Sequence, residues 1–450
     1  MTDTAVNEPA ASTEAVDNLA EDVAKVSTRD VQSNLAPDTE HEVEVKLADM
    51  QADPNSPLYS VKSFEELNLN ETLLKGIYDM KFTKPSKIQE RALPLLLSEP
   101  PKNMIGQSQS GTGKTAAFAL TMLSRIDTSL QATQAICLAP ARELARQIMD
   151  VVKEMGKFTE ATAAYALPGE SALPGSKITA QIIIGTPGKV GDLIKKGQIN
   201  PSKVKVFVLD EADNMIDQQG LGDQSIRIRN MMPKSCQIVL FSATFLDRVK
   251  QFATRFAPNA NQISLKQEEL SVDGIKQFYM DCNSEEHKYE VLVLLYSLLT
   301  IGQSIIFVKR RDTADEIARR MTSEGHAVIS LHGKQEPAER DFVIDSFRSG
   351  KSKVLITTNV LARGIDILQV NLVINYDMPL DAYNNPDPET YLHRIGRTGR
   401  FGRTGVSINF VHDKISWGHM HAIEQFFGRS ITRVPTDDFE EVEAILRKAL

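Results

Sequence analysis

The sequence predicts an α/β protein with two doubly wound parallel-sheet domains in tandem. Short, unbroken apolar runs alternate with segments of helical periodicity, which is typical of parallel strands covered by helices on both faces. This pattern lapses into a polar connector at residues 258–273 and then restarts. A chain of 450 residues is long enough for two or three domains, each with its own core.

The first half of the chain supplies the strands of the first predicted sheet. They are the apolar runs at residues 103–105, 135–138, 182–184, 206–209 and 238–241. The segment after Pro140 is predicted as a helix, because Leu144, Ile148, Val152 and Met155 recur on one helical face. Polar motifs follow the ends of these runs, where open α/β sheets bind ligands.

The second half repeats the pattern without a second phosphate-binding loop. Its predicted strands are residues 305–308, 328–331, 354–356, 372–374 and 406–410, with helices such as 312–321 between them. We therefore expect a leader at residues 1–60, a first domain at 61–262, a hinge at 263–273 and a second domain at 274–450.

The leader is acidic, and the rest of the chain is nearly neutral. Residues 1–60 hold 13 acidic and 3 basic side chains, so their charge is −10 and the remaining 390 residues sum to +2. An acidic leader with few aromatic residues is typical of a disordered segment. A near-neutral body still allows a nucleic-acid partner, provided that basic side chains gather in one cleft. Three cysteines without paired spacing, no signal peptide and no long apolar stretch predict a soluble protein of a reducing, intracellular compartment.

Residues 108–115, Ser-Gln-Ser-Gly-Thr-Gly-Lys-Thr, follow one predicted strand and open a helix. Glycines let backbone amides turn toward phosphates, Lys114 reaches the β- and γ-oxygens, and Thr115 offers its hydroxyl to Mg²⁺. The motif therefore predicts a nucleoside triphosphate site. Its residues are Ser108, Gln109, Ser110, Gly111, Thr112, Gly113, Lys114 and Thr115.

Two further motifs would complete an ATPase. Asp210 and Glu211 directly follow the predicted strand at 206–209, so Asp210 is predicted to hold Mg²⁺ and Glu211 to orient or deprotonate the attacking water. Arg394, Arg397 and Arg400 recur every three residues among glycines in the other half. We expect Arg397 and Arg400 to act as arginine fingers when the two domains meet.

In their joint order these motifs resemble the DEAD-box RNA helicases, from Phe64 to the C-terminal region. The resemblance implies RecA-like domains and an RNA-stimulated ATPase that uses ATP and Mg²⁺ and binds single-stranded RNA across both domains. Residues 82–89, Phe-Thr-Lys-Pro-Ser-Lys-Ile-Gln, resemble the family's Q motif. This implies that Phe82 stacks on adenine and that Gln89 reads the edge of the base.

The resemblance also assigns RNA contacts and coupling residues. The motifs are residues 140–145, 186–189, 242–244, 362–366 and 393–400. The implied RNA contacts are Pro140, Arg142, Thr186, Gly188, Lys189, Arg340, Thr358 and Gly364, and Asp366 is implied to touch the nucleotide. The implied coupling residues are Asp213, Ser242, Thr244 and His393. Ala141, Lys189 and Lys334 differ from the residues usual in the family at these positions, which leaves the strength of RNA binding open.

Within the family, several stretches resemble the ATPase that drives mRNA export at the nuclear pore: 46–59, 84–91, 107–111, 221–224, 358–362, 384–390 and 432–438. This resemblance implies a monomer of the cytoplasm and nucleus, at the cytoplasmic face of the nuclear envelope, without membrane insertion. It also implies a nucleoporin and an export mediator with inositol hexakisphosphate as partners, and a leader that restrains the closed state. The alternatives are a general DEAD-box helicase in translation initiation or ribosome assembly, an ATP-gated RNA clamp, and a DNA translocase.

Overall fold

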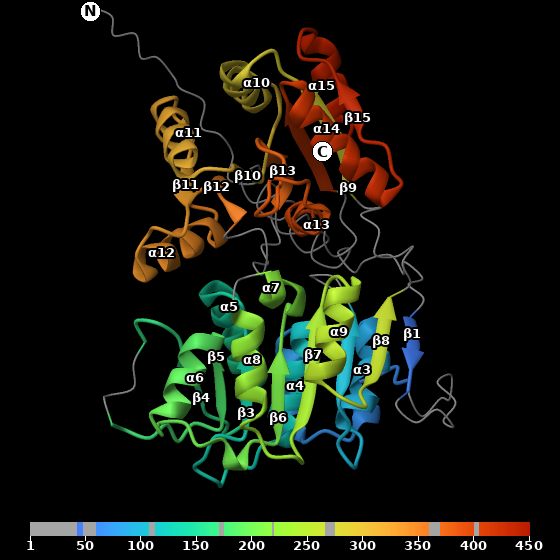
Figure 1. Cartoon of the computed structure of the whole chain (residues 1–450), viewed down its shortest axis with the longest axis vertical. Helices are drawn as coiled ribbons and strands as arrows, with labels where there is room; N and C mark the ends of the chain where they lie inside the picture. The colour runs from blue at the N-terminus through green and yellow to red at the C-terminus, as the bar shows by residue number, and fades with distance from the viewer. Residues whose placement is uncertain are drawn as a thin grey trace, which may run out of the picture.

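The computed structural model describes residues 43–47, 60–107, 113–170, 175–217, 220–265, 275–359, 370–399 and 405–450. These residues form two sheets, one from each half of the chain (Figure 1). The first sheet has the order β1-β8-β2-β7-β6-β3-β5-β4, and the second has the order β11-β12-β10-β13-β14-β9-β15. This topology confirms the predicted class of two tandem doubly wound α/β domains.

In the first sheet, β1 runs antiparallel to β8 and the other neighbours are parallel. The strands are β1 (Val43–Lys46), β2 (Met104–Gln107), β3 (Ala135–Leu138), β4 (Ala163–Ala166), β5 (Ile182–Gly185), β6 (Val206–Leu209), β7 (Gln237–Ser242) and β8 (Asn261–Leu265). The five apolar runs predicted as strands in this half correspond to β2, β3, β5, β6 and β7. They read as unbroken apolar runs because both of their faces are covered.

Two helical layers cover this sheet. The helices are α2 (Glu71–Asp79), α3 (Lys87–Leu97), α4 (Lys114–Arg125), α5 (Arg142–Met155), α6 (Pro187–Lys195), α7 (Ala212–Asp217), α8 (Leu221–Arg229) and α9 (Asp247–Phe256), with short 3₁₀ turns at Glu65–Leu67 and Pro201–Lys203. Side chains of one strand alternate between the two layers. Val208 packs toward α2 to α5, whereas Phe207 packs toward α6 to α9.

The second sheet is parallel throughout its described strands. The strands are β9 (Ile275–Asp281), β10 (Gln303–Phe307), β11 (Val328–Leu331), β12 (Val354–Thr357), β13 (Val370–Asn375), β14 (Gly405–Val411) and β15 (Thr432–Val434). The helices are α10 (Glu285–Leu298), α11 (Arg311–Ser323), α12 (Pro337–Arg348), α13 (Pro388–Ile395), α14 (Lys414–Phe427) and α15 (Phe439–Arg447). One core packs α10, α11 and α15 on the sheet, and a second packs α12 on it.

Two segments differ from the expected domain limits. Val43–Lys46, inside the predicted leader, forms the edge strand β1, and the half-buried Val45 packs on the first core. Strand β8 ends at Leu265, inside the predicted hinge at 263–273. Sequence patterns miss such strands because an edge strand, or a strand with a polar face, lacks a long apolar run. Apart from Leu47 and Ser60, the other predicted leader residues lie outside the described residues, as does most of the hinge.

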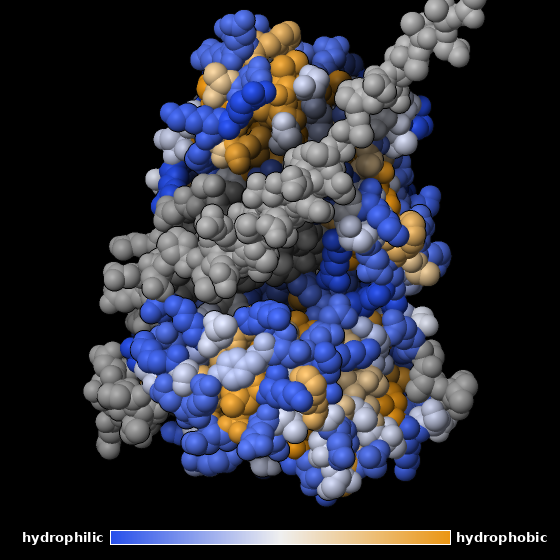
Figure 2. Space-filling view, turned by 180° about the vertical axis from the view of Figure 1, so that it is seen from behind, coloured by the Kyte–Doolittle hydropathy of each residue, from blue (hydrophilic) through white to orange (hydrophobic). Residues whose placement is uncertain are grey.

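The C-terminal ends of the first domain's parallel strands, β2 to β8, face the second domain, and α7 lies at this boundary (Figure 1). Helices α5 and α12 lie on the same side of the molecule, one from each domain. From behind, hydrophilic side chains of both domains face each other across the uncovered part of the boundary (Figure 2). No helix within the described residues is long and apolar enough to cross a membrane.

Candidate functional site

A buried cluster of carboxylates follows β6 at the domain boundary. Asp210 is 2 % exposed, Glu211 3 % and Asp213 0 %. Burial raises the pKa of Asp210, the nearby Lys114 lowers it, and Glu211 raises it further. Glu211 has a φ of +52°, in the left-handed region that costs a side chain about 1–3 kcal/mol. Its Oε2 accepts a hydrogen bond from Asn214 at 3.3 Å.

These residues fit a hard divalent cation. Lys114 and Thr115 occupy the first turn of α4, and Lys114 is 6 % exposed. Mg²⁺ binds through one or two protein oxygens together with waters and substrate phosphates, so it does not need a dedicated cage of three or more side chains. Burial disfavours the charged form of the Asp210 carboxylate. A cation bound beside it would stabilise that charged form. Within the described residues, no group of three or more metal-binding side chains is assembled.

Gln89 joins the Q motif to the phosphate loop. Its Oε1 accepts the Ser86 amide at 2.9 Å, which caps α3, and its Nε2 donates to the Gly113 carbonyl at 3.0 Å. Gly113 has a φ of +97°, and a Cβ there would lie 2.5 Å from the Gln89 Nε2. The half-buried Phe82 lines a small apolar cavity with Gln89 and Leu120. The predicted contacts of Phe82 and Gln89 with adenine stay predictions.

Asp213 contacts the other three residues predicted to couple hydrolysis to domain movement. Its Oδ2 accepts the backbone amide and the hydroxyl of Thr244, both at 3.0 Å. Its own amide donates to the Ser242 hydroxyl at 3.3 Å. From the other domain, the His393 Nε2 lies 3.2 Å from the same Asp213 Oδ2. All four predicted coupling residues therefore meet in one network across the boundary.

Helix α13 and the turn after it carry two buried arginines with different surroundings. Arg397 is 2 % exposed and its Nε donates to the His393 carbonyl at 2.9 Å, so it stays close to the interdomain contact. Arg394 is 1 % exposed and instead bonds to residues of its own domain. Arg394 and Arg397 are therefore not equivalent.

Two predicted RNA contacts pair with carboxylates across the boundary. Arg142, in the first turn of α5, lies 2.8 Å from Asp341 of α12 and 2.6 Å from Glu170. Arg340 of α12 lies 2.6 Å from Glu143 of α5. We call this set of opposite charges between α5 and α12 the α5–α12 charge contact; it also contains Arg146–Asp341, Arg146–Asp345 and Arg348–Asp150.

The other predicted RNA contacts lie at ends of strands and helices. Pro140 is buried just after β3, Thr186 precedes α6, and Gly188 and Lys189 lie in its first turn. Thr358 follows β12. The predicted residues outside the described ones are Ser108, Gln109, Ser110, Gly111, Thr112, Gly364, Asp366 and Arg400.

Residues that sequence reasoning missed include Glu143 and Asp341, the acidic partners in the α5–α12 charge contact. Each is an ordinary charged position on an amphipathic helix. The only signal was the adjacency of opposite charges in Arg142-Glu143 and Arg340-Asp341. That signal does not say which helix faces which, so it could not have found the contact alone.

Comparison with known proteins matches both halves of the chain to one group. Residues 86–252 match the DEAD/DEAH box helicase family, and residues 287–402 match the helicase conserved C-terminal domain. The ATP-dependent RNA helicase dbp5 of Schizosaccharomyces pombe is 69 % identical over 97 % of this chain and 86 % of its own length.

Solved structures agree with this match. The structure of S. cerevisiae Dbp5 bound to RNA and ADP BeF3 has a TM-score of 0.83 at 59 % identity, covering 87 % of this chain and 100 % of that one. A point variant of S. cerevisiae Dbp5, bound to Nup159, a Gle1 variant, IP6 and ADP, has a TM-score of 0.63 at 57 % identity, covering 85 % and 99 %. The extent of these matches shows that the chain belongs to the DEAD-box family of ATP-dependent RNA helicases.

Proposed function

We propose that this chain is an RNA-stimulated ATPase that remodels ribonucleoprotein particles during mRNA export at the nuclear pore. The network around Asp213 carries the proposal of coupled hydrolysis. One carboxylate binds Thr244 of its own domain and His393 of the other, only two residues from Glu211. A change at the hydrolytic centre can therefore alter the contact between the domains.

The first domain binds ATP. Lys114, in the first turn of α4, neutralises the β- and γ-phosphates, and the other residues of the loop at 108–115 donate backbone amides to them. Phe82 stacks on adenine, and Gln89 reads the base while holding the Gly113 carbonyl. Through the Gln89–Gly113 hydrogen bond, recognition of the base influences the conformation of the phosphate loop.

Glu211 orients or deprotonates the attacking water, and the second domain completes the site. Asp210 and the Thr115 hydroxyl would hold Mg²⁺, which neutralises charge on the phosphates. Arg397 and Arg400 bring positive charge to the γ-phosphate from the second domain, and Asp366 contacts the nucleotide. Turnover then requires both domains, which makes it sensitive to anything that changes their orientation.

Single-stranded RNA lies across both domains. Thr186, Gly188 and Lys189 hold it on the first domain, and Thr358 and Gly364 on the second. Arg142 and Arg340 must exchange their interdomain carboxylates for RNA phosphates, because the same guanidinium groups serve both contacts. Recognition through phosphates and 2′-hydroxyls is tolerant of sequence and favours RNA over DNA.

The partners follow from the relatives. S. cerevisiae Dbp5 has been solved in complexes with RNA and ADP BeF3, and, as a variant, with Nup159, a Gle1 variant, IP6 and ADP. We infer that this chain, as a monomer, binds the corresponding nucleoporin and an export mediator with inositol hexakisphosphate. We place it at the nuclear pore, on the cytoplasmic face of the envelope, with a leader at residues 1–60 that restrains closure.

The decisive test is phosphate release at saturating ATP, without nucleic acid, with single-stranded RNA and with DNA of the same sequence. Stimulation by RNA alone supports the proposal, whereas equal stimulation by DNA identifies a DNA translocase. A single turnover followed by a stall identifies an RNA clamp. Glu211→Gln should bind ATP and RNA but lose turnover by about a hundredfold or more, and normal turnover would remove Glu211 from its role.

A further inference from the structure

Arg394 lies in the arginine motif, yet its guanidinium points into the second domain. Its Nη1 donates to the Asn375 Oδ1 at 2.9 Å and to the Asp377 carbonyl at 2.7 Å. Its Nε donates to the Asn359 Oδ1 at 3.2 Å, and its Nη2 donates to the same oxygen. The group also lies over the Phe307 ring, 4.8 Å from its centroid. Every hydrogen bond of this side chain within the described residues therefore stays inside one domain.

The surroundings of Arg394 are costly for a cation. Its hydrogen-bond acceptors among the described residues are amide and carbonyl oxygens, with no carboxylate among them. Burial lowers the pKa of Arg394 to about 9, with smaller opposing effects from Asp377 and Asp387. A neutral residue of similar size would avoid this penalty. What only arginine supplies here is a rigid fork of five donors that fixes several acceptors at defined angles.

The fork joins two functional segments. Asn359 directly follows Thr358, the proposed RNA contact after β12. Arg394 itself is flanked on α13 by His393, which contacts Asp213, and lies three residues before Arg397. A shift of the segment after β12 thus moves an acceptor of Arg394 and, through it, the helix that carries the interdomain histidine and leads into Arg397.

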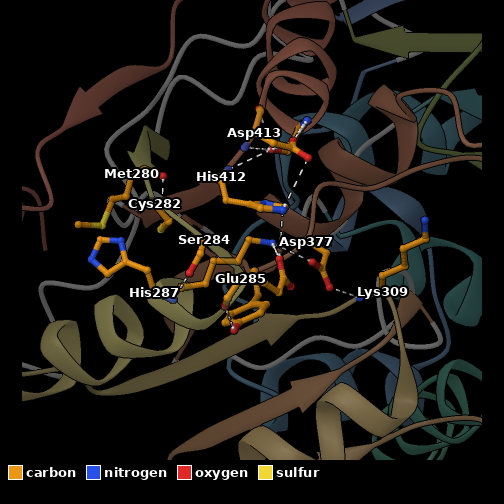
Figure 3. Close-up of polar contacts among 12 residues, drawn as sticks. Met280, Cys282, Ser284, Glu285, His287, Lys309, Asp377, His412 and Asp413 are labelled. Atoms are coloured by element: carbon orange, nitrogen blue, oxygen red, sulfur yellow. Dashed lines mark hydrogen bonds and ion pairs between the residues drawn. The ribbon is translucent and has the colours of Figure 1, made fainter.

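The other side of the fork is held fixed. The Asp377 carboxylate accepts the Lys309 amide at 2.7 Å and the Lys288 ammonium at 3.2 Å, and Lys288 also pairs with Glu285 at 2.8 Å. Figure 3 shows Asp377 lying between Lys309 and the Glu285 side of this cluster. Asn375 in turn donates to Asn409 of β14. Two of the three acceptors are therefore anchored in the sheet or directly beside it, whereas Asn359 is exposed just after β12.

We propose that Arg394 and Asn359 form a positioning pair that transmits RNA binding at Thr358 to α13, and so sets His393 and Arg397 for hydrolysis. This inference rests on the proposed RNA-stimulated activity. The pair touches neither substrate, so it changes how far RNA accelerates turnover rather than how tightly ATP binds. Asn359 is the movable acceptor. When the pair is broken, Asn375 and Asp377 keep Arg394 folded into its own domain, but Arg394 and α13 no longer follow the segment after β12 on RNA binding.

The test uses the full chain with Asn359→Ala, Asn359→Asp and Arg394→Lys. Asn359→Ala removes the acceptor from an exposed side chain, so the fold should persist. We expect the RNA-stimulated kcat to fall by about tenfold, because misplaced catalytic groups lose rate steeply, while the KM for ATP stays within about twofold. Asn359→Asp keeps an acceptor oxygen and should restore stimulation. Arg394→Lys keeps the charge but loses the fork, so it should resemble Asn359→Ala.

Asn283→Ala is the matched control, since it removes another exposed amide of the same domain. It should leave stimulation unchanged. Wild-type stimulation in Asn359→Ala, or failure of Asn359→Asp to restore it, would overturn the inference. An equal fall of basal and stimulated turnover would do the same, because it would indicate a structural role alone. Lack of RNA stimulation in the unmodified chain would instead reject the proposed function on which the inference rests.

Discussion

The Arg142 Nη2 lies 2.8 Å from the Asp341 Oδ2, so a proposed RNA-binding guanidinium is paired with a carboxylate of the other domain. The same carboxylate also contacts Arg146. Burial raises the pKa of Asp341, but hydrogen bonds from Arg142 and Arg146 and attraction to their charges together outweigh it and hold the pKa below its ordinary value. The Asp341 carboxylate is therefore charged at neutral pH and competes with RNA phosphate for both arginines.

Asp341→Asn should open the RNA-free protein. Removing the charge weakens the α5–α12 charge contact by roughly 1 kcal/mol, which changes the ratio of closed to open molecules about fivefold. Energy transfer between one fluorophore on each domain should fall at low ionic strength. The difference from the unmodified protein should shrink in high salt, because partly exposed charges are screened.

Asp345→Asn provides the matched control for this change. Its carboxylate lies on the same helix, but it is 59 % exposed and 3.8 Å from Arg146. We expect little change in energy transfer, since exposed pairs at this distance contribute little. Equal changes in the two variants, or none in Asp341→Asn, would show that the α5–α12 charge contact does not hold the domains together.

Gly113→Ala should weaken ATP binding. The glycine has a φ of +97°, and an added Cβ would lie 2.5 Å from the Gln89 Nε2, so the variant strains the backbone and displaces the glutamine. We expect the KM for ATP to rise by about tenfold, with a smaller effect on RNA binding, because the substitution breaks the hydrogen bond between the Q motif and the phosphate loop.

Gly197→Ala is the matched control, because it introduces backbone strain without displacing a neighbouring side chain. This glycine has a φ of +69°, but an added Cβ would meet nothing within 4 Å. The substitution should lower stability by about 1 kcal/mol and leave the KM for ATP unchanged. A similar rise in KM for both variants would assign the effect to general destabilisation and remove the proposed role of the Gln89–Gly113 bond.

The three cysteines should resist thiol reagents in the folded protein. All are buried, and burial raises the pKa of Cys236 and of Cys282 to about 12 and that of Cys137 well above 9.0. Because the thiolate is the reactive form, alkylation near pH 8 should require unfolding. The raised pKa values also mean that the folded state binds more protons than the unfolded state above pH 9, so stability should fall there. Mass spectrometry of protein treated in native buffer measures the labelling, and rapid labelling of these cysteines would contradict the prediction.

How far the sequence predicts the structure depends on whether a feature is local. Val206–Leu209 reads as a strand because helices cover both of its faces, whereas the edge strand Thr432–Val434 has one buried residue and leaves no such run. The placement of Lys114 at the start of α4 and of Asp210 directly after β6 was predictable, because each lies in a local motif beside a predicted strand. The Arg142–Asp341 pair was not, because it depends on how two separately folded domains meet.

Glu211→Asn should stabilise the protein while it abolishes turnover. Among the described residues, five other than glycine have a positive φ, and three of these are asparagines, which adopt this conformation readily. The substitution relieves backbone strain. It also removes the negative charge of Glu211, which raises the pKa of the neighbouring Asp210 and so disfavours its charged form. A gain of about 1 kcal/mol would raise the melting temperature of the first domain by roughly 2–4 °C. Glu211→Gln removes the charge but keeps a side chain that resists this φ, so calorimetry should place its melting temperature below that of Glu211→Asn. If the two variants melt together, the backbone at Glu211 stores no strain, and its left-handed conformation contributes only by aiming the carboxylate at the attacking water.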